Sequence, residues 1–299
     1  MFDYTIFLLF LVIRKVISLF PIKLRIKSVY FIARIVFLFA PKFKKIGINN
    51  ISKAFPNFSS IEKNELFKKS VYSFSRMIVD ALRISDLDKN WYGENILCDD
   101  IEVINRAREN AKVNNSGIMF LSGHLSSFEL LNGFAGFINT PINFVARELK
   151  NQYLDKWILD SRSKFGNNLI QRKGASQKIV SCLNNKENVA LLFDQNVRAA
   201  HAIFVPWFGE EAATTVVVGL SAYRTNCEIL VVGLKFDEEM KKYRLTVVEC
   251  NYQDCKDLEK DEFIYAVTKK ASDIFCKMVL EYPEGWFWMH NRWRTQKNF

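Results

Sequence analysis

The sequence predicts an α/β fold, in which helices pack against a β-sheet, with a helical segment at the N-terminus that binds a membrane. Three observations support this prediction. From about residue 60 the chain alternates between helical and strand-like patterns. Hydrophobic residues make up 49% of the chain and charged residues 25%, as in folded globular proteins. Nearly all of the net charge of +10 lies in the first 61 residues, which are also rich in apolar side chains.

The first 58 residues contain two apolar stretches that cations interrupt. Residues 4–13 are almost wholly apolar, but Arg14 and Lys15 follow them, and Arg34 lies within the second stretch, residues 28–40. Neither stretch reaches the roughly 18 uncharged residues expected of a spanning helix. With ten basic side chains and one acid, residues 1–61 suit an anionic membrane surface. Three interpretations of this segment stay open: a helix in the membrane interface, a helix that spans the membrane obliquely or once, and a buried helix of a soluble core. No cleaved signal peptide is expected.

The remaining elements follow from apolar periodicity and from turn residues. Helical spacing covers residues 60–82 and about 99–114. Residues 41–58 form the one linker-like break, so we expect a membrane-associated helical segment, 1–58, and a catalytic domain, 59–299. Further strands are expected at 117–122, 142–147, 189–193, 203–205, 229–236 and 243–250, and further helices at 126–138, 151–165, 174–184, 215–225 and 258–280.

The most informative segment is the corner where the strand at 117–122 gives way to a helix near Ser126. Gly123 and His124 end the strand, and Glu129 follows the histidine by five residues. In open α/β sheets ligands bind beyond the carboxyl ends of the strands, where this corner lies. An imidazole held there with a carboxylate beside it can act as a general base. The alternative is a capping box, in which Glu129 does no more than bond the backbone near Ser126.

Several chemistries find no support in the sequence. The motifs of phosphate-binding loops, dinucleotide-binding folds, zinc proteases and serine hydrolases are absent. The three histidines lie far apart and the six cysteines are scattered without a CxxC pair, so we expect no metal, no disulfide framework and no cofactor. Because the basic segment is interleaved with apolar residues, we do not expect a nucleic-acid partner.

Several blocks in order along the chain resemble the late acyltransferases of lipid A biosynthesis, a branch of the glycerolipid acyltransferase superfamily. His124 and Glu129 match the His-x4-acid motif of that superfamily. The other matching blocks cover most of the chain. They are residues 49–62 (NNISKAFPNFSSIE), Arg147 with residues 150–152 (KNQ), residues 194–196 (DQN, where the family ends in Asp), 205–215 (VPWFGEEAATT) and 285–295 (GWFWMHNRWRT).

The resemblance implies a mixed, largely parallel sheet flanked by helices, and an enzyme at the cytoplasmic face of the bacterial inner membrane. It implies transfer of a fatty acyl chain from acyl carrier protein or coenzyme A to a lipid A precursor. The acceptor is the hydroxyl of a 3-hydroxyacyl chain, and His124 takes its proton as the general base. Glu129 holds the imidazole in the right tautomer, as the acid of a triad does.

Four further residues are candidates for binding the substrate. Arg147 suits a phosphate or an oxyanion, unless it merely ends a strand. Asp194 follows an apolar run, where it is either a polar residue of the site or a helix cap. Asn151 belongs to the second block and Arg292 to the last block, as a contact for a phosphate. An acyltransferase for another membrane lipid and a non-catalytic membrane-surface protein remain as alternatives.

Overall fold

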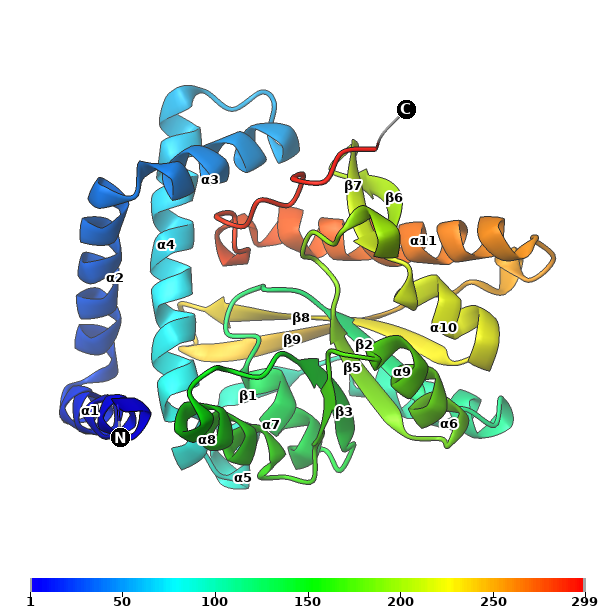
Figure 1. The fold of residues 1–299 in the computed structure, drawn as a ribbon, viewed down its shortest axis with the longest axis horizontal. Helices are drawn as coiled ribbons and strands as arrows, with labels where there is room; N and C mark the ends of the chain where they lie inside the picture. Colours follow the sequence, from blue (N-terminus) through cyan, green and yellow to red (C-terminus); the bar gives the residue numbers. More distant parts are fainter. Residues whose placement is uncertain (1, 298–299) are drawn as a thin grey trace.

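A seven-stranded sheet forms the centre of the protein (Figure 1). The computed structural model describes residues 2–297. Residue 1 of the expected N-terminal segment and residues 298 and 299 of the expected catalytic domain lie outside the described residues. The strand order is β1-β9-β8-β2-β5-β3-β4. All neighbouring strands pair in parallel except β8 and β9, which are antiparallel. This confirms the predicted α/β fold with a mixed, largely parallel sheet. The strands are β1 (Ile96–Cys98), β2 (Ile118–Ser122), β3 (Ile142–Ala146), β4 (Asn168–Gln171), β5 (Asn188–Leu192), β8 (Glu228–Asp237) and β9 (Lys242–Glu249).

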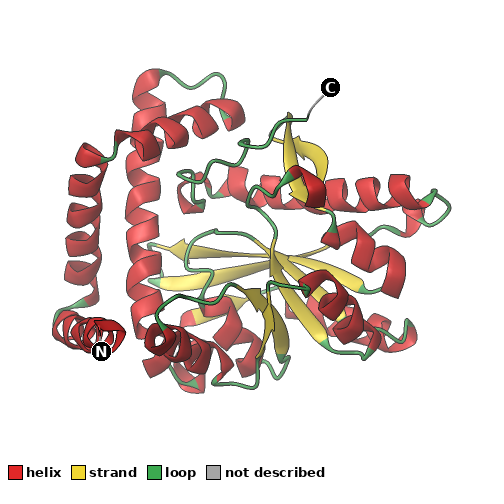
Figure 2. Cartoon of the chain, viewed as in Figure 1, coloured by secondary structure: helices red, strands yellow, loops and turns green. Residues whose placement is uncertain are grey.

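Helices cover both faces of this sheet, and the alternation of side chains along β2 shows how (Figure 2). Ile118 belongs to a core with helices α5, α6 and α7, whereas its neighbour Met119 belongs to a second core with α9, α10 and α11. Successive side chains of a strand point to opposite faces, so a strand buried on both sides is apolar throughout. The bounds are α5 (Lys89–Asn95), α6 (Ile101–Val113), α7 (Leu130–Phe137), α8 (Gln152–Ser163), α9 (Ala175–Asn184), α10 (Val217–Thr225) and α11 (Lys260–Glu281).

Three strands were not expected from the sequence. β1 and β4 lie at the two edges of the sheet and are only three and four residues long. The third, β7 (Glu210–Thr215), forms a separate antiparallel hairpin with β6 (Ala202–Trp207). The two residues between them, Phe208 and Gly209, both have positive φ, which a tight hairpin turn requires. Short 3₁₀ helices lie at Ile84–Asp86, Ala199–His201, Gln253–Cys255 and Pro283–Gly285.

The chain begins with four helices that come before α5 and the first strand: α1 (Phe2–Ser18), α2 (Ile22–Phe39), α3 (Pro41–Ala54) and α4 (Ser60–Arg83). Helix α2 packs along α4, and α1 lies against α8 (Figure 1). The capping box of α4 is formed by Ser59 and Glu62. Within residues 2–297, none of the helices is both long enough and apolar enough to cross a membrane. Many large apolar side chains of α1 and α2 are nevertheless exposed, including Leu9, Leu38 and Phe39.

Candidate functional site

His124 and Asp194 meet at the carboxyl edge of the sheet. Strands β2 and β5 are parallel neighbours, and their last residues, Ser122 and Leu192, stand opposite each other. Two residues beyond these matched ends come His124 and Asp194, so the sheet brings together side chains that are 70 residues apart in sequence. Nδ1 of His124 lies 2.9 Å from Oδ1 of Asp194, and the His124 backbone N–H donates to Oδ2 at 2.8 Å. One carboxylate therefore fixes both the ring and the backbone of the histidine.

The surroundings of Asp194 keep it ionised. Its side chain is only 3% exposed, and Trp286 Nε1 donates to Oδ2 at 2.9 Å. Burial by itself would raise the pKa of Asp194. The charge of His124 and the hydrogen bonds from His124 and Trp286 outweigh burial and lower this pKa to about 2. For His124 burial lowers the pKa, and Asp194 together with the charge of Glu129 outweighs burial, so the pKa lies above the usual 6.5. The pair thus suits a base that becomes protonated during the reaction.

The loop that carries His124 is irregular, which differs from the expected helix start near Ser126. Helix α7 begins only at Leu130, and Ser126 has a φ of 51°. The C-terminal segment holds this loop in place: Ser126 N–H donates to the carbonyl of Gly285, and Phe287 N–H donates to that of His124. A Cβ on Gly123 would lie 2.7 Å from Cγ of Asp194, so the close approach of loop and carboxylate requires glycine there.

Glu129 does not touch the imidazole ring in the way that we expected. Its two carboxylate oxygens accept from Nε and Nη2 of Arg162 on α8, at 3.0 and 2.5 Å. The carboxylate at Nδ1 of His124 is that of Asp194 instead. The physical reason is the irregular loop, which turns Glu129 toward α8 rather than back over the ring. The capping box with Ser126, which was the alternative interpretation of Glu129, is not formed either, because no helix begins at that point.

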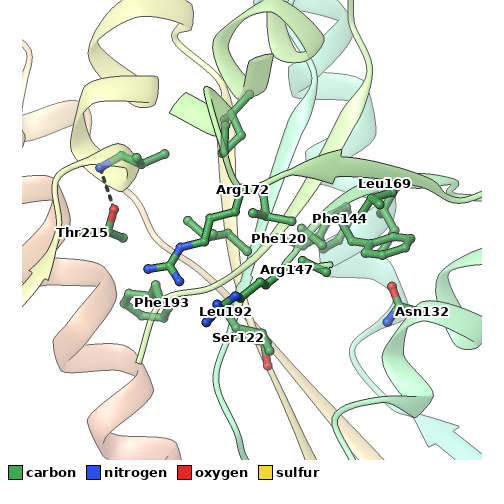
Figure 3. Close-up of a pocket in the computed structure, with 18 of the residues that line it drawn as sticks. Phe120, Ser122, Asn132, Phe144, Arg147, Leu169, Arg172, Leu192, Phe193 and Thr215 are labelled. Carbon is green, nitrogen blue, oxygen red and sulfur yellow. Dashed lines mark hydrogen bonds between the residues drawn. The ribbon is translucent and has the colours of Figure 1, made fainter. Parts of the chain in front are cut away.

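A cavity of about 1390 Å³ opens beside His124 along the carboxyl edge of the sheet. One part is apolar and lies between the sheet and α7, and Figure 3 shows Phe120, Phe144, Leu169 and Leu192 in its wall. These residues stand on one face of β2, β3, β4 and β5, as their register requires. Gln195 also lines the cavity, and its Nε2 lies 3.2 Å from Nε2 of His124. An apolar part of this kind, next to a few polar groups, is typical of a site for a lipid or other apolar ligand.

Comparison with known proteins identifies the family. The family model described as bacterial lipid A biosynthesis acyltransferase matches residues 1–295. The chain belongs to this family. Its relatives include the lipid A biosynthesis palmitoleoyltransferase of Escherichia coli K12 and the lipid A biosynthesis acyltransferase of Shigella flexneri. Each is 22% identical over 263 residues, which cover 86% of this chain and 81% of the relative. The protein is therefore an acyltransferase of lipid A biosynthesis, with an acyl donor and a lipid A precursor as its substrates.

For this acyltransferase the structure brings Arg147 to the cavity, as expected of a substrate-binding residue, but two other candidates lie elsewhere. Asn151 caps α8, where its Oδ1 accepts from the N–H groups of Tyr153 and Leu154, and its Nδ2 donates to the carbonyl of Asp3 on α1. Its amide is thus used for local structure, between α8 and α1, instead of lining the cavity.

Arg292 is fully buried behind the site and does not line the cavity. Its Nη1 donates to the carbonyl of Ala213 at 2.6 Å, its Nη2 donates to Thr214 Oγ1, and its guanidinium stacks on Trp207 at 4.4 Å. Burial lowers its pKa to about 10. Arg292 therefore ties the C-terminal segment to the hairpin of β6 and β7, where a substrate phosphate could not reach it.

Sequence reasoning missed three residues of the site. Arg162 belongs to no motif, because its partner Glu129 lies on another element. Gln195 and Trp286 stand inside the third and last blocks, but nothing in those blocks tells that one contacts His124 and the other Asp194. Asp194 could be found, because it follows a buried strand directly and belongs to the third block.

Proposed function

We propose that this lipid A acyltransferase uses His124 as the general base that takes the proton from the acceptor hydroxyl. The acceptor is the hydroxyl of a hydroxyacyl chain on the lipid A precursor, and the donor is an acyl thioester of acyl carrier protein or coenzyme A. One observation carries the proposal. Nδ1 of His124 is hydrogen-bonded to the buried Asp194, while its Nε2 is on the side of Gln195, which lines the cavity. A positioned base of this kind contributes about 10²–10⁴-fold to the rate.

The tautomer follows from the contacts of the ring. An ionised Asp194 can only accept, so Nδ1 of His124 carries the proton and Nε2 keeps its lone pair. The side-chain N–H of Gln195 donates to that lone pair, at the place that the substrate hydroxyl takes in the reactive complex. Asp194 stays ionised and stabilises the imidazolium that forms, and it takes the positioning role that we first expected of Glu129.

The steps balance without a nucleophile from the protein. The acceptor oxygen attacks the thioester carbonyl as Nε2 of His124 removes its proton, and a tetrahedral intermediate forms. Its C–S bond then breaks, the ester is complete, and the imidazolium returns the proton to the departing thiolate. The developing oxyanion needs a hydrogen-bond donor, and the amide of Gln195 is within reach of the reacting nitrogen. The apolar part of the cavity takes the fatty acyl chain.

Helices α1 and α2 bring the enzyme to its lipid substrate. Their exposed apolar side chains and the cations among them suit the anionic surface of the cytoplasmic face of the inner membrane. Binding to vesicles that contain anionic lipid should fall as salt rises, because the cations contribute about 1 kcal/mol each near such a surface. Sedimentation with anionic and with neutral vesicles measures this, and equal binding to both would contradict the electrostatic part.

Mass spectrometry of lipid A tests the reaction. Cells that lack the gene should have lipid A with one acyl chain fewer, and the wild-type protein should restore that chain. His124→Ala should fail to restore it although the protein is present in the membrane fraction. Asp257→Asn is the control, because Asp257 is exposed and remote from the cavity. Lipid A that is identical with and without the gene would refute the proposed function.

A further inference from the structure

A second part of the cavity carries five cationic side chains without an acidic partner. Among residues 2–297 none of them forms an ion pair, although many other cations of the protein do. The acids that line the cavity are engaged elsewhere: Glu129 pairs with Arg162, Glu148 accepts from Gln171, and Asp155 accepts from a backbone N–H. The five cations are Arg147, Arg172, Lys173, Arg198 and Arg224.

Two of these cations are neighbours because of the strand register. In the parallel pair of β3 and β4, Val145 stands opposite Ile170 and Ala146 opposite Gln171. The next residues of the two chains are Arg147 and Arg172, so the same register sets them side by side just beyond the strand ends. Side chains two apart on a strand share a face, so both arginines follow Val145 and Ile170 on the face opposite the apolar part. Figure 3 shows both side chains directed into the cavity.

Two adjacent guanidinium groups that form no ion pair repel each other, and like charges opposite each other destabilise a sheet. An anion between them removes this repulsion, and a phosphate accepts two hydrogen bonds from each arginine fork. Lys173 follows directly, and helix α9, which is ten residues long, begins at Ala175, so the positive end of its dipole lies at the same end of the cavity. Together these cations and the helix N-terminus favour a ligand with a double negative charge.

We propose that Arg147 and Arg172, with Lys173, bind a phosphate monoester of one of the two substrates. This inference rests on the proposed function, since it places the phosphate relative to His124. Strand β5 lies between β3 and β2, so two strand spacings, about 10 Å, separate the backbone of Arg147 from the loop of His124. The phosphate is thus a handle that holds the substrate in place, and it takes no part in the proton transfer. A sugar phosphate of the lipid acceptor and the phosphate of a phosphopantetheine thioester are its two possible sources.

Steady-state kinetics of Arg172→Gln with the full-length protein tests the site. Loss of a charged hydrogen-bond donor should raise one KM about tenfold to hundredfold and leave kcat within about threefold. A rise in the KM of the lipid acceptor assigns the site to the sugar phosphate, and a rise in that of the thioester assigns it to the carrier. Arg172→Lys should restore only part of the effect, because it keeps the charge and loses the fork. Arg106→Gln, at an exposed arginine outside the cavity, is the matched control.

A binding measurement separates this inference from the proposed reaction. Glucosamine 1-phosphate should raise the Tm of the wild-type protein, whereas glucosamine at equal ionic strength should not. The rise should disappear in the Arg147→Gln and Arg172→Gln proteins and persist in Arg106→Gln. These results stand even if the wild-type protein shows no acyl transfer, which would refute only the proposed function. No rise in Tm with the wild type, or unchanged values of both KM in Arg172→Gln, would overturn the phosphate site.

Discussion

Replacing Asp194 by Asn tests the assignment of the positioning acid most sharply. Asp194 accepts three hydrogen bonds: one from Nδ1 of His124 on Oδ1, and two from the His124 backbone and Trp286 on Oδ2. An asparagine has one acceptor oxygen and one donor nitrogen. If its oxygen keeps the two bonds on the Oδ2 side, its NH₂ group faces Nδ1 of His124. The imidazole must then carry its proton on Nε2, where the base needs a lone pair.

The size of the effect follows from this change of tautomer. A wrong tautomer of a catalytic histidine reduces kcat by about 10⁴-fold in the best-studied triads. We therefore expect Asp194→Asn to reduce kcat by about 10³–10⁴-fold, which corresponds to about 4–5.5 kcal/mol of activation free energy. Folding should suffer less, by about 1–3 kcal/mol, because one hydrogen bond to a charged group is lost and the shape is kept.

The assay compares two carboxylates in one protein. Acyl transfer from a thioester to the lipid acceptor is measured for Asp194→Asn and for Glu129→Gln, and urea unfolding of each variant shows how much stability is lost. Glu129 bonds Arg162 and reaches His124 only through its charge, so Glu129→Gln should cost at least tenfold less in kcat. A larger loss of kcat in Glu129→Gln than in Asp194→Asn would refute the assignment.

Three further predictions concern titration and stability. The rate of acyl transfer should rise with pH and reach half of its maximum above pH 6.5, because the base must be neutral and Asp194 raises the pKa of His124. A midpoint below 6.5 in a pH–rate profile would contradict this. Asp80→Ala should lower the free energy of unfolding, measured in urea, by about 3–5 kcal/mol. The reason is that the buried Asp80 accepts hydrogen bonds from Ser127 and Tyr243 and pairs with Arg83. A loss below about 1 kcal/mol would contradict this and show that these partners rearrange. Arg292→Met should lower the free energy of unfolding by about 1–3 kcal/mol and leave the KM of the lipid acceptor unchanged, whereas a higher KM in a protein of normal Tm would restore Arg292 as a substrate contact.

The sequence predicts the strands that are rich in apolar residues and fails for those that are short or polar. β2 and β5 are apolar runs between turn residues, and both were expected close to their observed bounds. β7, with the sequence EEAATT, has no apolar alternation, and it is a strand because β6 pairs with it. β1 and β4 are too short for a periodicity to show. Edge position and pairing are tertiary properties that local patterns do not carry.

The site was predictable in part, for a similar reason. His124 could be found because a strand ends in Gly-His at the edge where α/β sheets bind ligands. Its contact with Asp194 depends on β5 lying beside β2, and the strand order cannot be read from local patterns. Glu129 was the nearer acid in sequence, but the irregular loop directs it to Arg162, 33 residues later. Asn151 and Arg292 belong to blocks that match the family, but Asn151 caps α8 and Arg292 packs against the hairpin of β6 and β7.

The most direct test of the account is the rate of acyl transfer by purified wild-type and His124→Gln proteins under saturating substrates. The glutamine side chain keeps a polar group in the cavity but cannot take up a proton at neutral pH. We predict a loss of about 10²–10⁴-fold in kcat with little change in the Tm, since His124 is partly exposed and its backbone bond to Asp194 remains. A kcat within about twofold of the wild-type value would contradict the claim that this imidazole removes the proton.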